Sequence, residues 1–173
     1  AAAIIRLVST SSFLQGERAP RPWEKGKVVA RGAVDVTGAS LFSELPIRLD
    51  EDQIQAAREA LREKLFVITG GPGTGKTTLL VSLLAILKRA KVSFALAAPT
   101  GRAAKRMQET CGEEAATIHR LLEYNPREGG FQRDRDNPLQ VDVVIVDEAS
   151  MIDLTLMDHL LQAVEPHSHL ILV

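Results

Sequence analysis

The 173-residue sequence has little of several features that mark other classes of protein. Its single cysteine, Cys111, excludes an internal disulfide and a metal site built from several cysteines, and it suits the reducing cytoplasm. The net charge of −1 gives no overall positive field, so any nucleic-acid site must be local. Aromatic residues are only 4%, which predicts an aliphatic core. No apolar run approaches the roughly 20 residues that span a bilayer.

The sequence also lacks an initiator methionine, so we expect it to be an internal part of a longer chain. Residues 1–46 are irregular and include the proline-rich stretch "APRPW" at 19–23. The valine-rich residues 27–37 predict a hairpin or two short strands. Residues 47–173 have a more regular pattern and are expected to form one domain, which leaves residues 1–46 as a segment of unknown role.

From residue 49 onward, short apolar runs alternate with amphipathic stretches. Helices are expected at residues 50–64, 76–90, 101–111, 117–124 and 151–164, strands at 65–69, 92–98, 141–148 and 169–173, and a polar loop at 125–140. The strand at 65–69 is expected to be buried on both faces. Alternating strands and helices predict an α/β fold with right-handed crossovers around a parallel sheet.

The stretch "TGGPGTGKTT" matches the phosphate-binding pattern Gly70-x-x-x-x-Gly75-Lys76-Thr77, with a strand before it and a helix after it. Backbone N–H groups at a helix start bind phosphate, and glycine lets the backbone come close. We expect Lys76 to bring charge to the outer phosphates and Thr77 to bind Mg²⁺. The alternative is a glycine-rich turn without a ligand. The expected nucleotide-binding residues are Gly71, Pro72, Gly73, Thr74, Gly75, Lys76, Thr77 and Thr78.

Two acids, Asp147 and Glu148, end the apolar run "VVIV". Open α/β sheets place their ligands at the carboxyl ends of strands. We therefore expect Asp147 to hold Mg²⁺ through water and Glu148 to polarise the attacking water, with Lys76 as the third catalytic residue. The alternative is a solvated acidic pair at the start of the next helix.

The motifs "LDEDQIQAA", "TGGPGTGKTT", "APTGRAAKRM", "ATIHRLL" and "VIVDEASMID" occur in one order over residues 47–173. Together they resemble superfamily 1 DNA helicases, most closely the RecD-like group. The resemblance implies a three-layer, RecA-like P-loop NTPase with helices on both faces of the sheet. It also implies ATP and Mg²⁺ as cofactors, and 5′→3′ movement on single-stranded DNA in repair or recombination. Subunits of a repair nuclease are implied as partners.

Within this resemblance, Gln53 is placed to read adenine, because an amide donates and accepts at once. Gln55 is the neighbouring alternative, and a surface glutamine on a helix is the structural one. The motif "APTGRAAKRM" and the threonine and histidine of "TIHR" resemble DNA-contacting segments, for which a basic helix face and a structural histidine are the alternatives. The implied DNA-binding residues are Pro99, Thr100, Gly101, Arg102, Lys105, Thr117 and His119.

The resemblance also implies a segment that senses the γ-phosphate and a second RecA-like domain beyond Val173. The 173 residues would then hold half of an ATP site, and we expect them to hydrolyse ATP negligibly by themselves. Two other classes stay open: a different P-loop enzyme, such as a recombinase or a small-molecule kinase, and a nucleotide-binding module without catalysis of its own.

Overall fold

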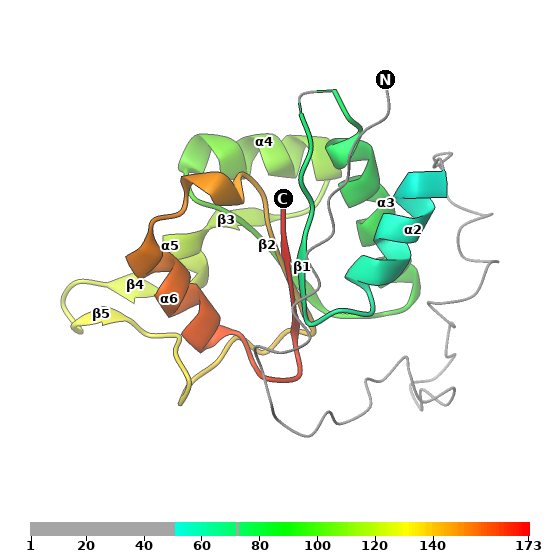
Figure 1. The fold of residues 1–173 in the computed structure, drawn as a ribbon. Coiled ribbons are helices and arrows are strands. Elements are labelled where there is room, and N and C mark those ends of the chain that lie inside the picture. Colours follow the sequence, from blue (N-terminus) through cyan, green and yellow to red (C-terminus); the bar gives the residue numbers. More distant parts are fainter. Residues whose placement is uncertain (1–50, 72) are drawn as a thin grey trace. The chain divides into compact units, whose positions relative to one another are not determined.

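A computed structural model describes residues 51–71 and 73–173 (Figure 1). The chain divides into two compact units after Ser93, and each is described by itself. The strands expected at residues 27–37 and the expected boundary after residue 46 lie outside the described residues, as does Pro72.

The first unit contains helix α2 (Glu51–Ala60), strand β1 (Leu65–Val67) and helix α3 (Lys76–Arg89). Helix α2 packs against α3 and β1, and its alanines Ala56, Ala57 and Ala60 are buried. Helix α3 begins directly after the glycine-rich loop, as the sequence predicted. It ends in Lys88 and Arg89, where positive charge complements the helix dipole.

The second unit contains a parallel sheet in which four strands pair in the order β7-β6-β2-β3. The strands are β2 (Phe94–Ala98), β3 (Ala115–Thr117), β6 (Val143–Val146) and β7 (His169–Leu172). Strand β6 is buried along its whole length, which accounts for its four consecutive β-branched residues. The pairs Ala97↔Val146 and Ala98↔Thr117 align the carboxyl ends of three strands at one edge.

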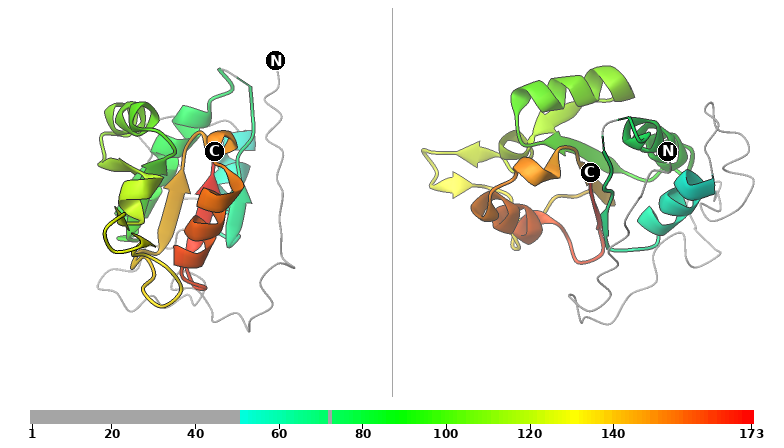
Figure 2. Two further views of the ribbon diagram at one scale, coloured as in Figure 1. Left: turned by 90° about the vertical axis from the view of Figure 1, so that its left-hand side faces the viewer. Right: turned by 45° about the horizontal axis from the view of Figure 1, so that its top comes forward.

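Helices cover both faces of this sheet. They are α4 (Gly101–Cys111), α5 (Ile118–Leu121), the short 3-10 helix η1 (Ala149–Met151) and α6 (Leu154–Ala163). The chain moves outward from β2 to β3 but in the other direction from β6 to β7. Right-handed crossovers therefore put α4 and α6 on opposite faces. Figures 1 and 2 show α4 on one face, with α5 and α6 on the other.

This arrangement confirms the predicted α/β fold with helices on both faces of a parallel sheet. Helix α4 has the predicted bounds, because Thr100 caps its start and Gly112 ends it in a left-handed conformation (φ 69°). It lies close to β2 through small residues, since Ala98, Ala103 and Ala104 form one buried cluster. No helix among the described residues is long and apolar enough to cross a membrane.

Three expectations about the elements were wrong in detail. Helix α2 ends at Ala60 rather than at residue 64, because Arg62 N–H donates to the carbonyl of Glu59 and tightens the last turn. Strand β1 is not buried on both faces: Phe66 is buried, but its neighbours are half-buried. The helix expected at 151–164 begins only at Leu154, where the side chain of Asp153 accepts a hydrogen bond from Leu156 N–H.

The region expected to be a short helix and a polar loop contains more structure than predicted. Strand β3 precedes α5, which is only four residues long. Strands β4 (Tyr124–Asn125) and β5 (Gly130–Phe131) then form an antiparallel hairpin. Two-residue strands carry too little periodicity to be recognised, although "NP" and "GG" between two aromatic residues are turn signals.

Candidate functional site

The glycine-rich loop between β1 and α3 is held by its own side chains. The Lys76 ammonium donates to the carbonyl of Gly70, and to that of Gly71 at 3.3 Å. The Thr74 hydroxyl donates to the same Gly71 carbonyl at 2.8 Å. Gly73 and Gly75 have φ of 76° and 83°, a conformation that glycine adopts without strain. Lys76 is thus folded back along the loop, as a residue that brings charge to bound phosphates requires.

Gln53 of helix α2 lies against this loop. It is only 9% exposed, and a Cβ added to Gly75 would lie 2.4 Å from its Nε2. Gln55 is exposed instead, and its amide donates to Glu59 one turn further along α2. Of the two glutamines, the structure therefore favours Gln53 as the residue associated with the phosphate loop. It also rules out the view that Gln53 is an exposed surface residue.

The acidic pair lies where β6 leaves the sheet of the second unit. Asp147 N–H donates to the carbonyl of Ala97 at 3.0 Å and extends the pairing with β2. Asp147 Oδ1 accepts from Glu148 N–H at 2.9 Å. Glu148 has φ of 54°, a left-handed conformation that costs a non-glycine residue about 1–2 kcal/mol. Such conformations concentrate at functional sites, and this one turns the chain from β6 into η1.

Cys111, at the end of α4, experiences the charge of the same acid. Burial raises the pKa of its thiol, and the negative charges of Asp147 and then Glu113 raise it further. The thiol is therefore kept neutral and unreactive.

Two helix starts lie next to each other at the same edge of the sheet. Thr100 accepts a hydrogen bond from Ala103 N–H, and Thr117 accepts one from Arg120 N–H, each at 3.2 Å. The register Ala98↔Thr117 aligns the two strands that lead into these caps. Each threonine hydroxyl uses its oxygen for the cap and retains its own proton for an acceptor such as a phosphate oxygen.

The remaining residues expected to bind DNA have different environments. Gly101, Arg102 and Lys105 are exposed, and Lys105 forms an exposed ion pair with Glu109 at 3.8 Å. Pro99 is half-buried at the end of β2.

His119 is exposed but belongs to an aromatic cluster. Its ring lies 5.7 Å from that of Tyr124 and 5.5 Å from that of Phe131, between centroids. Phe131 also contacts His159 of α6 at 4.5 Å. This cluster was missed from the sequence, because its four members come from four elements, α5, β4, β5 and α6.

The structure thus groups the expected residues in two sets. Gln53 lies with the phosphate loop in the first unit. Asp147 and Glu148 lie at the sheet edge with Thr100 and Thr117 in the second. The part of the chain that the structure describes holds no group of three or more His, Cys, Asp or Glu side chains that could bind a metal. Mg²⁺ commonly takes one or two carboxylates together with substrate phosphates, so one acid and one hydroxyl suit it.

A family model described as an AAA domain matches residues 53–173. The chain belongs to the AAA domain family. The match covers the phosphate loop, the acidic pair and both capped helix starts, and the family implies nucleotide binding.

Curated relatives show which kind of protein the chain resembles within this family. The chain is 44% identical over 147 residues to RecBCD enzyme subunit RecD of Mycolicibacterium smegmatis, covering 71% of this chain and 26% of that protein. It is 41% identical over 125 residues to the ATP-dependent RecD2 DNA helicase of Deinococcus radiodurans, covering 72% and 17%. These matches confirm the predicted resemblance to RecD-like helicases, and they show that the chain spans about a quarter or less of these relatives.

A solved structure supports the fold. The crystal structure of Bacteroides Pif1 bound to ssDNA matches 73% of this chain and 32% of that one, with a TM-score of 0.51 and 24% identity. At this level of identity the match bears on the fold alone, and it agrees with the RecA-like fold that the resemblance implied.

Proposed function

We propose that this AAA domain is the first motor domain of an ATP-dependent DNA helicase that moves along single-stranded DNA in repair or recombination. The observation that carries the proposal is the carboxyl edge of the sheet at residues 94–173. There Asp147 and Glu148 follow β6, and capped helix starts follow β2 and β3, the next two strands along the sheet. A P-loop enzyme for small molecules needs the acids but not the basic start of α4.

This proposal gives each of the expected ATP-binding residues a role. The loop amides and Lys76 bind the phosphates, Gln53 contacts the adenine, and Glu148 orients the attacking water. Thr77 and Asp147 would each offer an oxygen ligand to Mg²⁺, which when bound would neutralise charge on the phosphates. The exposed hydroxyl of Thr77 and the half-buried carboxylate of Asp147 fit a cation that prefers oxygen ligands.

The DNA path in this proposal runs over the starts of α4 and α5. The N–H groups of the first turn of α4 attract a phosphate, and Arg102 and Lys105 add positive charge. Further along the same edge of the sheet, Thr117 and His119 contact the single-stranded DNA. The proposed 5′→3′ direction, the partner subunits and a cytoplasmic location rest on the likeness to RecD proteins, one of which is named as a subunit of the RecBCD enzyme.

The decisive experiment compares ATP hydrolysis by the full-length protein with and without single-stranded DNA. We expect DNA to stimulate hydrolysis and Lys76→Ala to abolish it while the melting temperature stays within a few degrees of wild type. Lys88→Ala, which removes an exposed charge at the other end of the same helix, is the matched control. ATP hydrolysis that single-stranded DNA does not stimulate would favour another class of P-loop enzyme. Full ATPase activity of Lys76→Ala would refute the role of the loop in binding ATP.

The isolated 173 residues offer a second test. Because arginine fingers can contribute a thousandfold or more to the rate, we expect this chain alone to bind ATP weakly, to hydrolyse it negligibly and to unwind nothing. Robust DNA-stimulated turnover by the isolated chain would contradict the proposed division of the active site between two domains.

A further inference from the structure

The β4–β5 hairpin is too short to hold its own orientation. It has two residue pairs, Tyr124↔Phe131 and Asn125↔Gly130. An isolated two-stranded hairpin is marginally stable in water even when longer, so the restraint that fixes this one must come from outside its strands.

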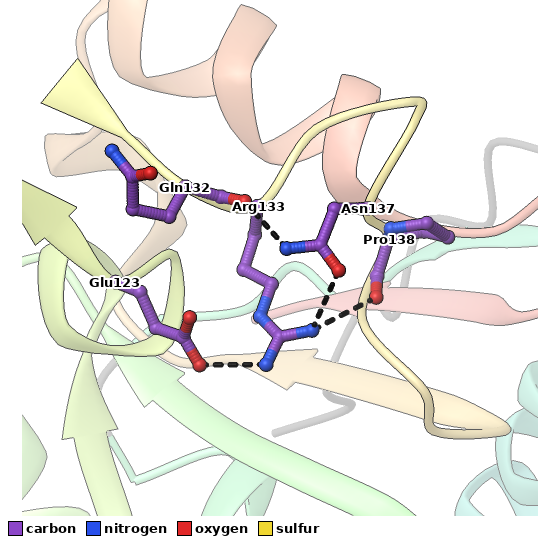
Figure 3. A network of polar contacts seen from close by, with 5 residues as sticks. All are labelled: Glu123, Gln132, Arg133, Asn137 and Pro138. Atoms are coloured by element: carbon purple, nitrogen blue, oxygen red, sulfur yellow. Dashed lines mark hydrogen bonds and ion pairs between the residues drawn. The ribbon is translucent and has the colours of Figure 1, made fainter. Parts of the chain in front are cut away.

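Arg133 provides such a restraint (Figure 3). Its Nη2 donates to Glu123 Oε1 at 2.7 Å, just before the hairpin begins. Its Nη1 donates to Asn137 Oδ1 at 3.3 Å and to the carbonyl of Pro138 at 3.4 Å. Its backbone N–H donates to the carbonyl of buried Leu122 at 3.2 Å. One guanidinium therefore joins the entry to the hairpin, its exit and the following loop, and its side chain is only 25% exposed.

The loop that Arg133 contacts is itself anchored. Asn137 Nδ2 donates to the carbonyl of Gln132 at 2.8 Å, and Asp134 Oδ1 accepts from Asn137 N–H at 2.9 Å. Leu139 is buried, and its N–H donates to the carbonyl of Ala163 in α6 at 2.8 Å. The guanidinium thus connects the hairpin to a segment that is fixed to the body of the second unit and leads into β6.

The hairpin in turn contacts the residue proposed to bind DNA. Phe131 lies two positions before Arg133, and its ring packs between His119 of α5 and His159 of α6. Tyr124 packs against His119 and Phe131 and is half exposed. A change in the orientation of the hairpin would therefore move Tyr124 and Phe131, the two rings that contact His119.

We propose that Arg133 is a positioning residue: through Glu123 and the 134–138 loop it fixes the hairpin, and through Phe131 it holds His119 where that ring contacts single-stranded DNA. The inference rests on the DNA-binding role proposed above for His119. Lysine can replace Arg133 only in part, because an ammonium is a point charge and lacks the planar fork that serves three acceptors on two sides.

The first measurement is hydrogen exchange of the amides of residues 122–133 in the full-length protein. We expect Arg133→Met to speed their exchange roughly five- to tenfold, the change that loss of a typical net hydrogen-bond contribution brings to a local opening equilibrium. Arg133→Lys should fall between Arg133→Met and wild type. Arg135→Met is the matched control, since it removes the same charge from an exposed position in the same loop. Unchanged exchange in Arg133→Met would overturn the inference, whether or not the protein binds DNA.

The second measurement tests the connection to His119. We expect Arg133→Met to weaken binding of a single-stranded oligonucleotide about three- to tenfold, and to add little further loss when His119→Ala is already present. If the losses in affinity of the two single variants multiply in the double variant, Arg133 does not act through His119. If wild type fails to bind the oligonucleotide while the exchange result stands, the proposed function is overturned and the DNA part of this inference with it.

Discussion

Replacing Gly75 with alanine tests how Gln53 and the phosphate loop depend on each other. A Cβ at position 75 would lie 2.4 Å from Gln53 Nε2, well inside van der Waals contact. The left-handed backbone at φ 83° costs alanine about 1–2 kcal/mol, offset by about 0.4–1 kcal/mol because the unfolded chain loses freedom. Moving the buried amide of Gln53 from its place adds about 1–3 kcal/mol. We expect a total loss of about 1–5 kcal/mol.

Gly73→Ala is the matched control for this prediction. Its φ of 76° imposes the same backbone strain, but no heavy atom lies within 4 Å of the added Cβ. The free energy of unfolding in urea should therefore fall by about 1–3 kcal/mol more for Gly75→Ala than for Gly73→Ala. Adding Gln53→Ala should recover most of that difference, because it removes the side chain that clashes. Equal losses for the two glycine variants, or no recovery by Gln53→Ala, would refute the packing of Gln53 against the loop.

Three further predictions concern the second unit. Thr100→Ala should lower the free energy of unfolding by about 1 kcal/mol, because the α4 cap is lost. Thr100→Ser keeps a capping hydroxyl and should lose much less stability. Equal losses for the two variants would argue against the cap. Arg102→Ala should reduce the slope of log affinity against log salt for single-stranded DNA by about 0.7, unlike Arg89→Ala, and a salt-independent loss would indicate a folding defect. Burial, Asp147 and Glu113 raise the pKa of Cys111. A thiol reagent should therefore label Cys111 more slowly at pH 8–9 in the native protein than in urea. The stability contributed by the neutral thiol should decline as pH rises past the pKa that the thiol has in the unfolded chain. Equal labelling rates would contradict the burial of this thiol.

Some features of this chain could be predicted because they are set by neighbours in sequence. The phosphate loop needs its glycines, lysine and threonine at fixed spacing before a helix, and α3 begins at Lys76 as that spacing requires. Helix α4 has the predicted bounds because its cap and its terminating glycine adjoin it in the sequence. Asp147 and Glu148 could be placed because an unbroken apolar run predicts a buried strand, and ligands gather at the carboxyl end of such strands.

Other features were decided only by the tertiary structure. Gln53 and Gln55 lie on the same helix with the same chemistry; the resemblance favoured Gln53, and packing against Gly75 is the physical feature that distinguishes it. The salt bridge between Arg133 and Glu123 joins residues ten apart across a hairpin whose strands are too short to show a period of two. The hairpin supplies the aromatic neighbours of His119, and the ring of Phe131 in the hairpin also contacts His159 of α6. The sequence by itself determined the chemistry of the loop and the acids, because that chemistry is local. The contacts that orient Gln53, His119 and Arg133 connect separate elements, so they exist only once the chain has folded.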